Sequence, residues 1–163
     1  MTTAVLSIGA NLGDRRAALQ GAVDAFRPWL VAVSPVYETP PWGPVPQDDY
    51  LNAVLVVRDE QATAQDWLVR AHAAEQSAGR VRDVRWGPRS LDVDVIAVDD
   101  VHSNDPVLTL PHPRAAERAF VLVPWRDVQP DARLDGIRIT DHIGRLDPDD
   151  VANVRRRDDE AVR

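Results

Sequence analysis

Residues 51–79, LNAVLVVRDEQATAQDWLVRAHAAEQSAG, pass within a few positions from a β-rich run to a helical pattern. The run Leu51–Val57 predicts a strand, because apolar and β-branched residues fill most of it. Thr63 and Asp66 have the spacing of a helix N-cap and the acidic residue three positions later, and an apolar face with helical spacing begins at Trp67. This stretch therefore predicts a strand followed by a helix.

Similar elements lie on both sides of this stretch. Ala4–Ile8 predicts a strand and residues 15–26 a helix. Residues 31–38 predict a strand in which Pro35 indicates a sheet edge or a bulge, and Leu91–Val98 predicts a last strand. The order is strand, helix, strand, strand, helix, strand. Short right-handed crossovers then favour a single α+β domain over all 163 residues, with a ferredoxin-like split βαβ sheet and helices packed on its faces.

Two connections in the first half of the chain have distinctive compositions. Residues 9–13 begin and end in Gly and predict a tight turn, after which Asp14 can cap the first helix. Residues 39–49, TPPWGPVPQDD, contain four Pro and one Gly, so they predict a stiff loop.

The pattern is weaker after residue 98. Residues 106–113 predict irregular backbone, residues 114–128 a helix in two pieces around Pro124, and residues 140–146 a short helix. The charged tail from about Asp147 is expected to fray. The chain after residue 98 then has to cover the second face or an edge of the sheet.

The composition excludes several classes of protein. The chain has no Cys, which excludes a disulfide scaffold, a thiolate zinc site, an iron–sulfur cluster and a Cys nucleophile. The net charge of −7 argues against general nucleic-acid binding, which needs a positive surface. No apolar run is long enough to span a membrane, and the first residues lack the features of a signal peptide. We therefore expect a cytoplasmic protein with no nucleic-acid or membrane partner.

The strongest signal for chemistry is a basic cluster beside two acidic residues. Residues 80–89 contain four Arg and one Asp, a local charge of +3. Asp92 and Asp94 follow at i and i+2 on a predicted strand, so their side chains share a face. Adjacent carboxylates repel unless cations neutralise them, and Mg²⁺ does so while keeping positions open for substrate phosphates. With Arg beside them for the remaining phosphate charge, these residues predict polyphosphate transfer.

Other interpretations of the same residues stay open. The simplest is an exposed polar strand face beside a solvated basic loop. A second is a ferredoxin-like binding module for RNA or a regulatory nucleotide, which the net negative charge and the strand-face carboxylates disfavour. A third is a nucleotidyltransferase that uses the same metal site and releases pyrophosphate instead of AMP.

A second group of residues suits a flat, polar heterocycle. Tyr50 and Asn52 alternate onto one strand face directly after the stiff loop, so an aromatic plane lies beside an amide that donates and accepts. Ordinary edge-strand packing of Tyr50 is the alternative. His112 lies in LPHPR, residues 110–114, with no second ligand candidate beside it, and alone it favours a structural role.

Several segments together resemble one family, the 6-hydroxymethyl-7,8-dihydropterin pyrophosphokinases of folate biosynthesis. They cover about residues 5–125, and the most specific is RWGPRSLDVD, residues 85–94. The others are IGANLGDR (8–15), SPVYETPPWG (34–43), residues 47–52, GRVR (79–82), LPHPR (110–114) and RAFVL (118–122). The resemblance implies a ferredoxin-like α+β core and transfer of the pyrophosphoryl group of ATP to the pterin hydroxymethyl oxygen, with release of AMP.

The resemblance also implies roles for individual residues. Asp92 and Asp94 would bridge two Mg²⁺ ions that hold the triphosphate, while Arg80 and Arg82 would stabilise phosphate charge, Arg82 in the transition state. ATP would be contacted by Arg89, His112 and Arg118 and bordered by Leu68, Glu75, Trp86, Val95 and Thr109. The pterin would stack between Tyr50 and Phe120, with its edges read by Asn52, Thr39 and the backbone of Pro40 and Trp42. The expected partners are these two small molecules, and the expected state is a monomer.

The chain departs from the family pattern at a few positions. Ala10 stands where members often have Ser, Val107 where some have a nucleotide-contacting Arg, and Pro113 where others have an aromatic residue. Asp83 lies between the Arg pairs, where members often carry a base. These departures concern ATP binding and the basic loop, and they leave both Asp residues and the Tyr/Asn pair in place.

Overall fold

The computed structural model describes residues 1–41, 43–78 and 90–163. Its main sheet has six strands in the order β10-β3-β4-β1-β5, with β2 also paired to β4. The strands are β1 (Thr2–Ala10), β2 (Leu30–Val33), β3 (Tyr37–Thr39), β4 (Tyr50–Asp59), β5 (Asp92–Val98) and β10 (Arg155–Arg156), and their pairs are antiparallel. Because β2 and β3 share the place of one strand, the order is that of a split βαβ sheet, and the predicted α+β fold is confirmed.

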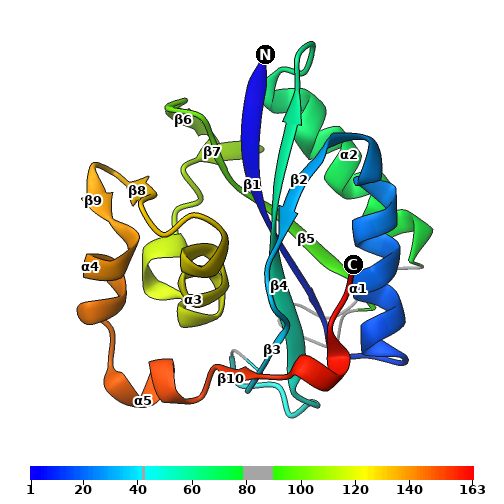
Figure 1. The fold of residues 1–163 in the computed structure, drawn as a ribbon, viewed down its shortest axis with the longest axis vertical. Coiled ribbons are helices and arrows are strands. Elements are labelled where there is room, and N and C mark those ends of the chain that lie inside the picture. The colour runs from blue at the N-terminus through cyan, green and yellow to red at the C-terminus, as the bar shows by residue number, and fades with distance from the viewer. Residues whose placement is uncertain (42, 79–89) are drawn as a thin grey trace.

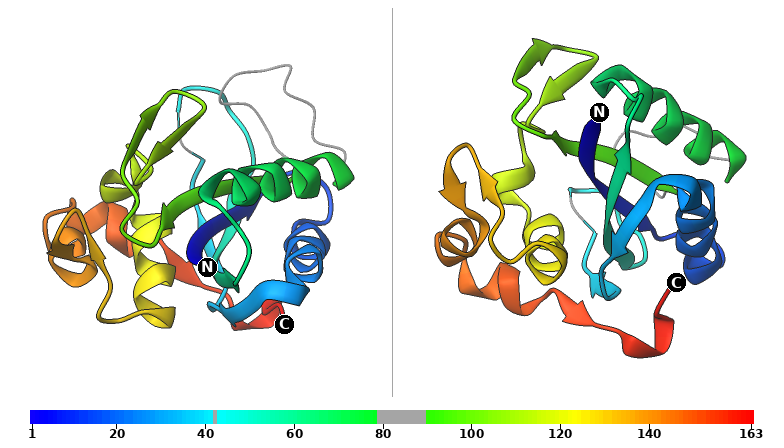
Figure 2. Two further views of the ribbon diagram at one scale, coloured as in Figure 1. Left: turned by 90° about the horizontal axis from the view of Figure 1, so that it is seen from above. Right: turned by 45° about the horizontal axis from the view of Figure 1, so that its top comes forward.

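The helices lie on both faces of this sheet. Helices α1 and α2 cover one face, and α3 packs on the other with α4 and α5 beyond it (Figure 1). Figure 2 shows the same layers from two other directions. The helices are α1 (Arg15–Ala25), α2 (Ala64–Ser77), α3 (Ala119–Val128), α4 (Ile139–Gly144) and α5 (Pro148–Ala152), with 3₁₀ turns η1 (Arg27–Trp29), η2 (Ala115–Glu117) and η3 (Asp158–Glu160). The prediction that the later part of the chain covers the second face is confirmed.

Helices α1 and α2 begin at the caps that the sequence predicts. Asp14 Oδ1 accepts the Ala17 N–H at 3.0 Å. The second cap is reciprocal, since Thr63 Oγ1 accepts the Asp66 N–H at 3.3 Å and Asp66 Oδ2 accepts the Thr63 N–H at 2.8 Å. These bonds satisfy amides that a helix start leaves unpaired, and they fix where each helix begins.

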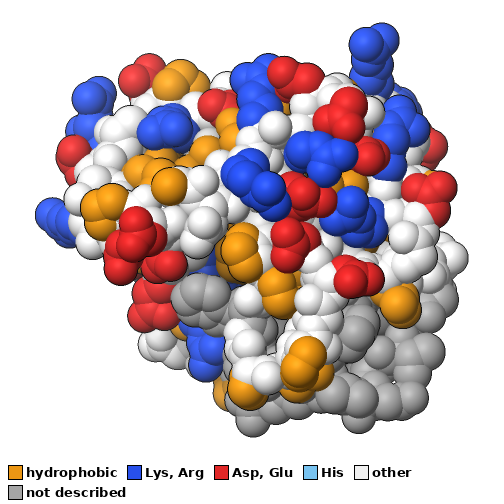
Figure 3. All heavy atoms as spheres, turned by 90° about the horizontal axis from the view of Figure 1, so that it is seen from below, with side chains coloured by type: hydrophobic (Ala, Val, Ile, Leu, Met, Phe, Trp, Pro, Cys, Tyr) orange, Lys and Arg blue, Asp and Glu red, His pale blue; other side chains and the backbone are white. Residues whose placement is uncertain are grey.

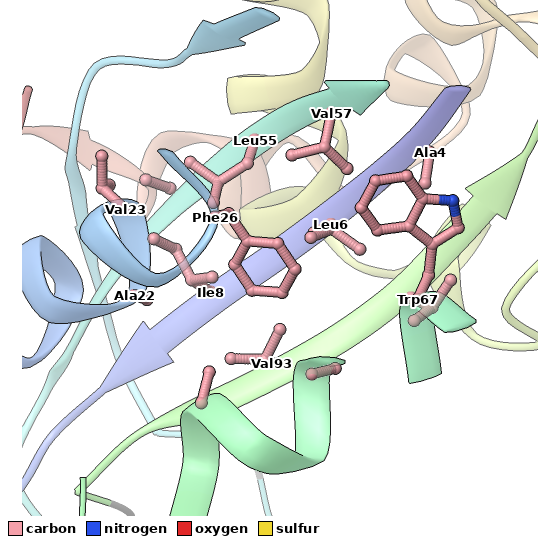
Figure 4. Close-up of a cluster of buried hydrophobic side chains, with 14 of the residues drawn as sticks. Ala4, Leu6, Ile8, Ala22, Val23, Phe26, Leu55, Val57, Trp67 and Val93 are labelled. Carbon is pink, nitrogen blue, oxygen red and sulfur yellow. The ribbon is translucent and has the colours of Figure 1, made fainter. Parts of the chain in front are cut away.

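The sheet face under α1 and α2 carries the larger core. Alternate residues of β1 and β4 point toward this core, because successive side chains of a strand face opposite sides. Phe26 and Trp67 are buried there with ring centroids 6.5 Å apart. Figure 4 shows both rings beside Leu6, Ile8 and Leu55 of the sheet. Burial of these rings holds α1 and α2 against the strands.

The opposite face of the sheet is apolar over only part of its length. Val5, Val54 and Ile96 form a second core with Leu122 and Trp125 of α3. Further along the same strands, the residues on this face are polar and line a cavity. The change from apolar to polar along one face thus separates the α3 packing surface from the cavity.

Two predictions about the connections are wrong. The predicted turn at residues 9–13 starts too early, because Gly9 and Ala10 continue β1 and pair with Asn52 and Leu51 of β4. Residues 106–113 are not irregular throughout. They include β7 (Leu108–Leu110), which forms a hairpin with β6 (Ser103–Asp105). A further hairpin, β8 (Arg133–Leu134) with β9 (Ile137–Arg138), follows α3.

Pro124 does not divide the predicted helix. Helix α3 runs through Pro124, and the break lies at Arg118, between η2 and α3. A proline inside a helix removes one backbone hydrogen bond, and burial of the apolar face of α3 outweighs that loss.

The charged tail does not fray. After α5 the chain pairs with β3 as β10, forms η3, and places Val162 in the main core with 5% of its surface exposed. Several of the charges that suggested a solvated tail form ion pairs, among them those of Arg155 and Arg157 with Glu38. Within the described ranges, no helix has the length and apolar character needed to cross a membrane.

Candidate active site

One cavity of about 580 Å³ lies where the polar part of the sheet meets α2, β7 and the start of α3. The predicted site residues that line it are Thr39, Pro40, Tyr50, Asn52, Leu68, Glu75, Asp92, Asp94, Val95, Thr109, His112, Arg118 and Phe120. The structure thus brings together the acidic pair, the described residues expected to contact the nucleotide and the described residues expected to contact the heterocycle. Trp42, Arg80, Arg82, Trp86 and Arg89 lie outside the described residues.

Residues paired across three neighbouring strands form one row, and the two ends of the cavity lie along it. Gly9 of β1 pairs with Asn52 of β4 on one side and with Asp92 of β5 on the other. In the next row on this face, Ser7 pairs with Asp94. Neighbouring strands are about 4.8 Å apart, so the backbones of Asn52 and Asp92 are separated by about 10 Å. Only a glycine lies between them in the row.

Gly9 leaves room for the Asn52 amide. A Cβ on Gly9 would lie 2.7 Å from Asn52 Oδ1, closer than side chains approach. Asn52 Nδ2 donates to Thr39 Oγ1 at 2.7 Å, and both residues are buried. This bond fixes the orientation of the amide, with Oδ1 over Gly9 on the cavity floor.

The acidic end of the cavity lies beside a buried guanidinium. Arg118 Nη1 is 4.0 Å from Asp94 Oδ2, and the Arg118 side chain is 12% exposed against 38% for Asp94. The buried Nε of Arg118 has no hydrogen-bond partner among the described residues, which is the kind of donor that an anionic ligand satisfies.

The two carboxylates fit a divalent cation whose coordination shell is supplied partly by the protein and partly by a bound substrate. In the described part of the chain, no cluster of three or more His, Cys, Asp or Glu could hold a metal ion. Two carboxylates would leave an ion at Asp92 and Asp94 positions for phosphate and water oxygens, which Mg²⁺ commonly uses.

His112 is neutral at pH 7. Burial, followed by the charges of Arg118 and Arg114, lowers its pKa to about 4 against the opposing effect of Asp92. His112 Nδ1 accepts the Arg114 backbone N–H at 3.2 Å, and this bond assigns the ring proton to Nε2. The ring can then donate one hydrogen bond without adding charge. His112 also lines the cavity, so it lies at the candidate site.

Glu75 joins α2 to the edge of the sheet. Its buried Oε2 accepts the Val93 N–H at 3.0 Å. Strand β5 lies at the edge of the sheet, and the Glu75 carboxylate accepts a backbone N–H that a further strand would otherwise bind. Leu68 and His72 line the cavity from the same helix.

Sequence reasoning missed several residues of the cavity wall. Ser7 and Gly9 alternate along β1, a signal that the predicted turn concealed. His72 lies four residues after Leu68, so helical spacing could have placed it in the site. Arg114 lies two residues after His112 and also lines the cavity.

Comparison with known proteins gives consistent matches. A family model described as 7,8-dihydro-6-hydroxymethylpterin-pyrophosphokinase (HPPK) matches residues 5–130. A 2-amino-4-hydroxy-6-hydroxymethyldihydropteridine pyrophosphokinase of Mycobacterium tuberculosis (strain CDC 1551 / Oshkosh) is 46% identical over 168 residues, covering 95% of this chain and 89% of the relative. Proteins of the same description from Mycobacterium leprae (strain TN) and Methylorubrum extorquens are 49% and 42% identical, covering 90% and 94% of this chain and 82% and 99% of the relatives.

Solved structures share the fold at low sequence identity. A Plasmodium falciparum HPPK-DHPS A437G with SDX-DHP has a TM-score of 0.68 at 13% identity, covering 88% of this chain and 45% of that chain. A crystal structure of an HPPK-DHPS in complex with substrates has a TM-score of 0.65 at 12% identity, covering 88% of this chain and 43% of that chain. This chain thus spans less than half the length of these solved chains, and the likeness concerns the fold.

Proposed function

The chain belongs to the 7,8-dihydro-6-hydroxymethylpterin-pyrophosphokinase family, and from this premise we propose how its cavity performs the reaction. It is a diphosphokinase of folate biosynthesis that transfers the pyrophosphoryl group of ATP to 6-hydroxymethyl-7,8-dihydropterin and releases AMP.

The observation that carries this proposal is the row formed by Asn52, Gly9 and Asp92 across β4, β1 and β5. The polar groups for a heterocycle lie at one end of the row and the carboxylates for a phosphate-bound cation at the other. A separation of about 10 Å between the outer backbones leaves space over Gly9 for the group that joins the substrates. The row therefore supports a reaction between a pterin substituent and a polyphosphate.

The pterin occupies the end formed by β3, β4 and α3. Tyr50 and Phe120 both line this end and supply aromatic planes for its ring. Asn52 presents an oriented amide that its bond to Thr39 holds in place, and this amide reads the polar edge of the ring. The backbone of Pro40, with that of Trp42, completes the recognition.

The nucleotide occupies the end formed by α2, β5, β7 and the start of α3. The neutral His112 ring donates from Nε2, and Arg118 supplies buried charge for the polyphosphate. Arg89 adds a further phosphate contact. The residues that border the nucleotide are Leu68, Glu75, Trp86, Val95 and Thr109.

Asp92 and Asp94 hold Mg²⁺, with two ions as the proposed number. When bound, the metal neutralises phosphate charge and supports the geometry of transfer. The hydroxymethyl oxygen forms a bond to the β-phosphorus and loses its proton to solvent. The bond between that phosphorus and the oxygen bridging to the α-phosphorus breaks, so AMP leaves with the bridging oxygen. Arg80 and Arg82 stabilise the charge that develops, Arg82 in the transition state.

The chain supplies both halves of this site. We therefore propose that residues 1–163 act as one domain and that the working state is a monomer, in which Tyr50, Asn52, Asp92 and Arg118 come from one chain. The cytoplasm is the proposed location, since it is the compartment that supplies ATP.

A product assay tests the proposed function. Purified protein is incubated with ATP, 6-hydroxymethyl-7,8-dihydropterin and Mg²⁺, and the nucleotide products are separated by chromatography. AMP and pterin diphosphate are expected in equal amounts, with product formation lost in EDTA and restored by excess Mg²⁺. Release of pyrophosphate instead of AMP would indicate a nucleotidyltransferase. Full activity in EDTA would exclude the metal role.

A further inference from the structure

The segment 155–163 runs from the edge of the sheet to α1 (Figure 1). Arg155 and Arg156 pair with Glu38 and Tyr37 of β3, and the Arg157 N–H donates to the Val36 carbonyl at 2.8 Å. The same segment then reaches α1, where side chains of that helix bind its backbone. The Arg16 Nε donates to the Ala161 carbonyl at 3.1 Å, and the Gln20 Nε2 donates to the Arg163 carbonyl at 2.6 Å. The segment is therefore attached at both ends.

Glu38 is the centre of an ion-pair cluster beside this segment. Its side chain is 13% exposed, and its Oε2 lies 2.7 Å from Arg15 Nη1 and 3.1 Å from Arg157 Nη1. Its Oε1 lies 3.2 Å from Arg155 Nη2. Burial alone would raise the pKa of Glu38, but the bond from Arg15 and the charges of Arg157 and Arg155 hold the pKa below its usual value. Arg and acidic side chains are interspersed on the surface seen from below in Figure 3.

The same cluster also contacts the end of the loop that follows β3, at residue 49. Arg15 Nη1 donates to the Asp49 carbonyl at 3.1 Å, and Arg155 Nη2 lies 3.3 Å from Asp49 Oδ2. Asn11 Nδ2 donates to Gln47 Oε1 at 2.7 Å and to the Asp48 carbonyl at 2.9 Å. Arg15 and Arg155 thus hold both Asp49, just before Tyr50, and Glu38, just before Thr39.

Thr39 and Tyr50 are themselves register partners on β3 and β4. Strand β3 has only three residues, so its position depends on what holds its ends and its outer edge. Glu38 precedes Thr39 and Asp49 precedes Tyr50, and Arg155 contacts both acidic residues. One guanidinium thus links the two chain positions that present the proposed pterin contacts.

We propose that Arg155 and Arg157 are positioning residues for the pterin half of the site. They act through Glu38 and Asp49 to hold Thr39 and Tyr50 in the geometry that binds the pterin ring. Among the described residues, the proposed nucleotide contacts come from other elements: α2, β5, β7 and the start of α3. Loss of the two guanidinium groups should therefore weaken pterin binding selectively. This inference rests on the proposed function of the cavity.

Steady-state kinetics with each substrate varied in turn tests the inference. The double variant Arg155→Ala/Arg157→Ala should raise the KM for the pterin about three- to tenfold, and leave the KM for ATP and kcat within about twofold. Arg156→Ala is the matched control, because Arg156 lies between the two and its Nε donates to Asp158 at 2.6 Å. The double variant Arg155→Lys/Arg157→Lys, which keeps both charges, should recover most of the pterin affinity.

Each result decides the inference. An unchanged pterin KM, an equal rise in both KM values, or the same effect from Arg156→Ala would overturn it. If the double variant does not fold, Arg155→Ala and Glu38→Gln carry the test, since the Arg155 side chain is 58% exposed and Gln keeps the size of Glu38. Both should raise the pterin KM selectively. If the wild-type protein formed no AMP, the proposed function would be refuted. If the variants were active with an unaltered pterin KM, only the positioning role would be refuted.

Discussion

The Tyr37 hydroxyl donates a hydrogen bond to the Asp127 carboxylate and so joins β3 to the last turn of α3. Burial and this bond raise the pKa of Tyr37 to about 12. Strand β3 carries Thr39 and α3 carries Phe120, two residues proposed to contact the pterin from different sides. The bond therefore sets the relative position of two walls of the cavity.

Removing that hydroxyl should lower stability in a pH-dependent way. Tyr37→Phe should reduce the free energy of unfolding by about 1 kcal/mol at pH 7, the usual value of one hydrogen bond. Because the folded pKa is above the unfolded value of about 10, the Tyr37 contribution is complete below pH 10 and is lost as the pH rises toward 12. Urea unfolding from pH 7 to 11.5 measures this. A variant that loses stability at alkaline pH as steeply as the wild type would contradict the assignment.

A side chain at Gly9 should disturb pterin binding. In Gly9→Ala the new Cβ would meet Asn52 Oδ1 at 2.7 Å, so the amide has to move and its bond to Thr39 is strained. We expect the pterin KM to rise about tenfold or more, with a smaller change for ATP. Gly21→Ala is the control, because a Cβ there meets nothing within 4 Å, and it should stabilise α1 by about 0.5–1 kcal/mol. Equal kinetics for both variants would show that Asn52 does not need that space.

The acidic pair should be essential for activity and dispensable for folding. Asp92→Ala and Asp94→Ala should each lower the rate of AMP formation by more than about a thousandfold, because the site loses a ligand of the proposed metal. Both variants should still fold, although Asp94→Ala should melt below the wild type, because it removes the carboxylate that faces the buried Arg118 guanidinium at 4.0 Å. The exposed Asp100→Ala serves as a control. Near-normal turnover in either site variant would refute the metal role.

His112 should titrate far below the usual range for histidine. Burial, followed by the charges of Arg118 and Arg114, lowers its pKa to about 4. The unfolded chain then binds the proton more tightly than the folded chain, so the His112 contribution to stability is complete above pH 6.5 and decreases toward pH 4. The ring resonances followed by NMR should shift with a midpoint near pH 4 in the wild type. His112→Gln should lose part of the acid-dependent decrease in unfolding free energy, and a midpoint near 6.5 would contradict this account.

The sequence allowed much of the cavity to be predicted, because its residues obey short-range rules. Asp92 and Asp94 share a strand face through the two-residue period, as do Tyr50 and Asn52, and the structure brings both pairs to one cavity. The caps at Asp14 and Thr63 follow from equally local rules. Their roles in binding and catalysis stay predictions that the experiments above address.

The misplaced elements depend on contacts that no local pattern contains. Gly9 suggests a turn by its own preference, yet pairing with strands on both sides keeps it extended. Arg155 and Glu38 are 117 positions apart, so their ion pair could not be read from the charge pattern of the tail. Burial of α3 likewise overrides the local effect of Pro124. In each case tertiary packing decides against the local preference.

The contribution of the 155–163 segment to stability can be measured at Val162. This side chain is 5% exposed and lies in the core between the sheet, α1 and α2, so its truncation should leave a small cavity. Val162→Ala should lower the free energy of unfolding by about 1–2 kcal/mol in urea denaturation. Val69→Ala is the matched control, because Val69 is 66% exposed on α2, where Ala is the better helix former. That control should be neutral or slightly stabilising. Equal stability of the two variants would mean that the segment does not stay packed in solution, and the positioning of Thr39 and Tyr50 through Arg155 and Arg157 would then lose its structural basis.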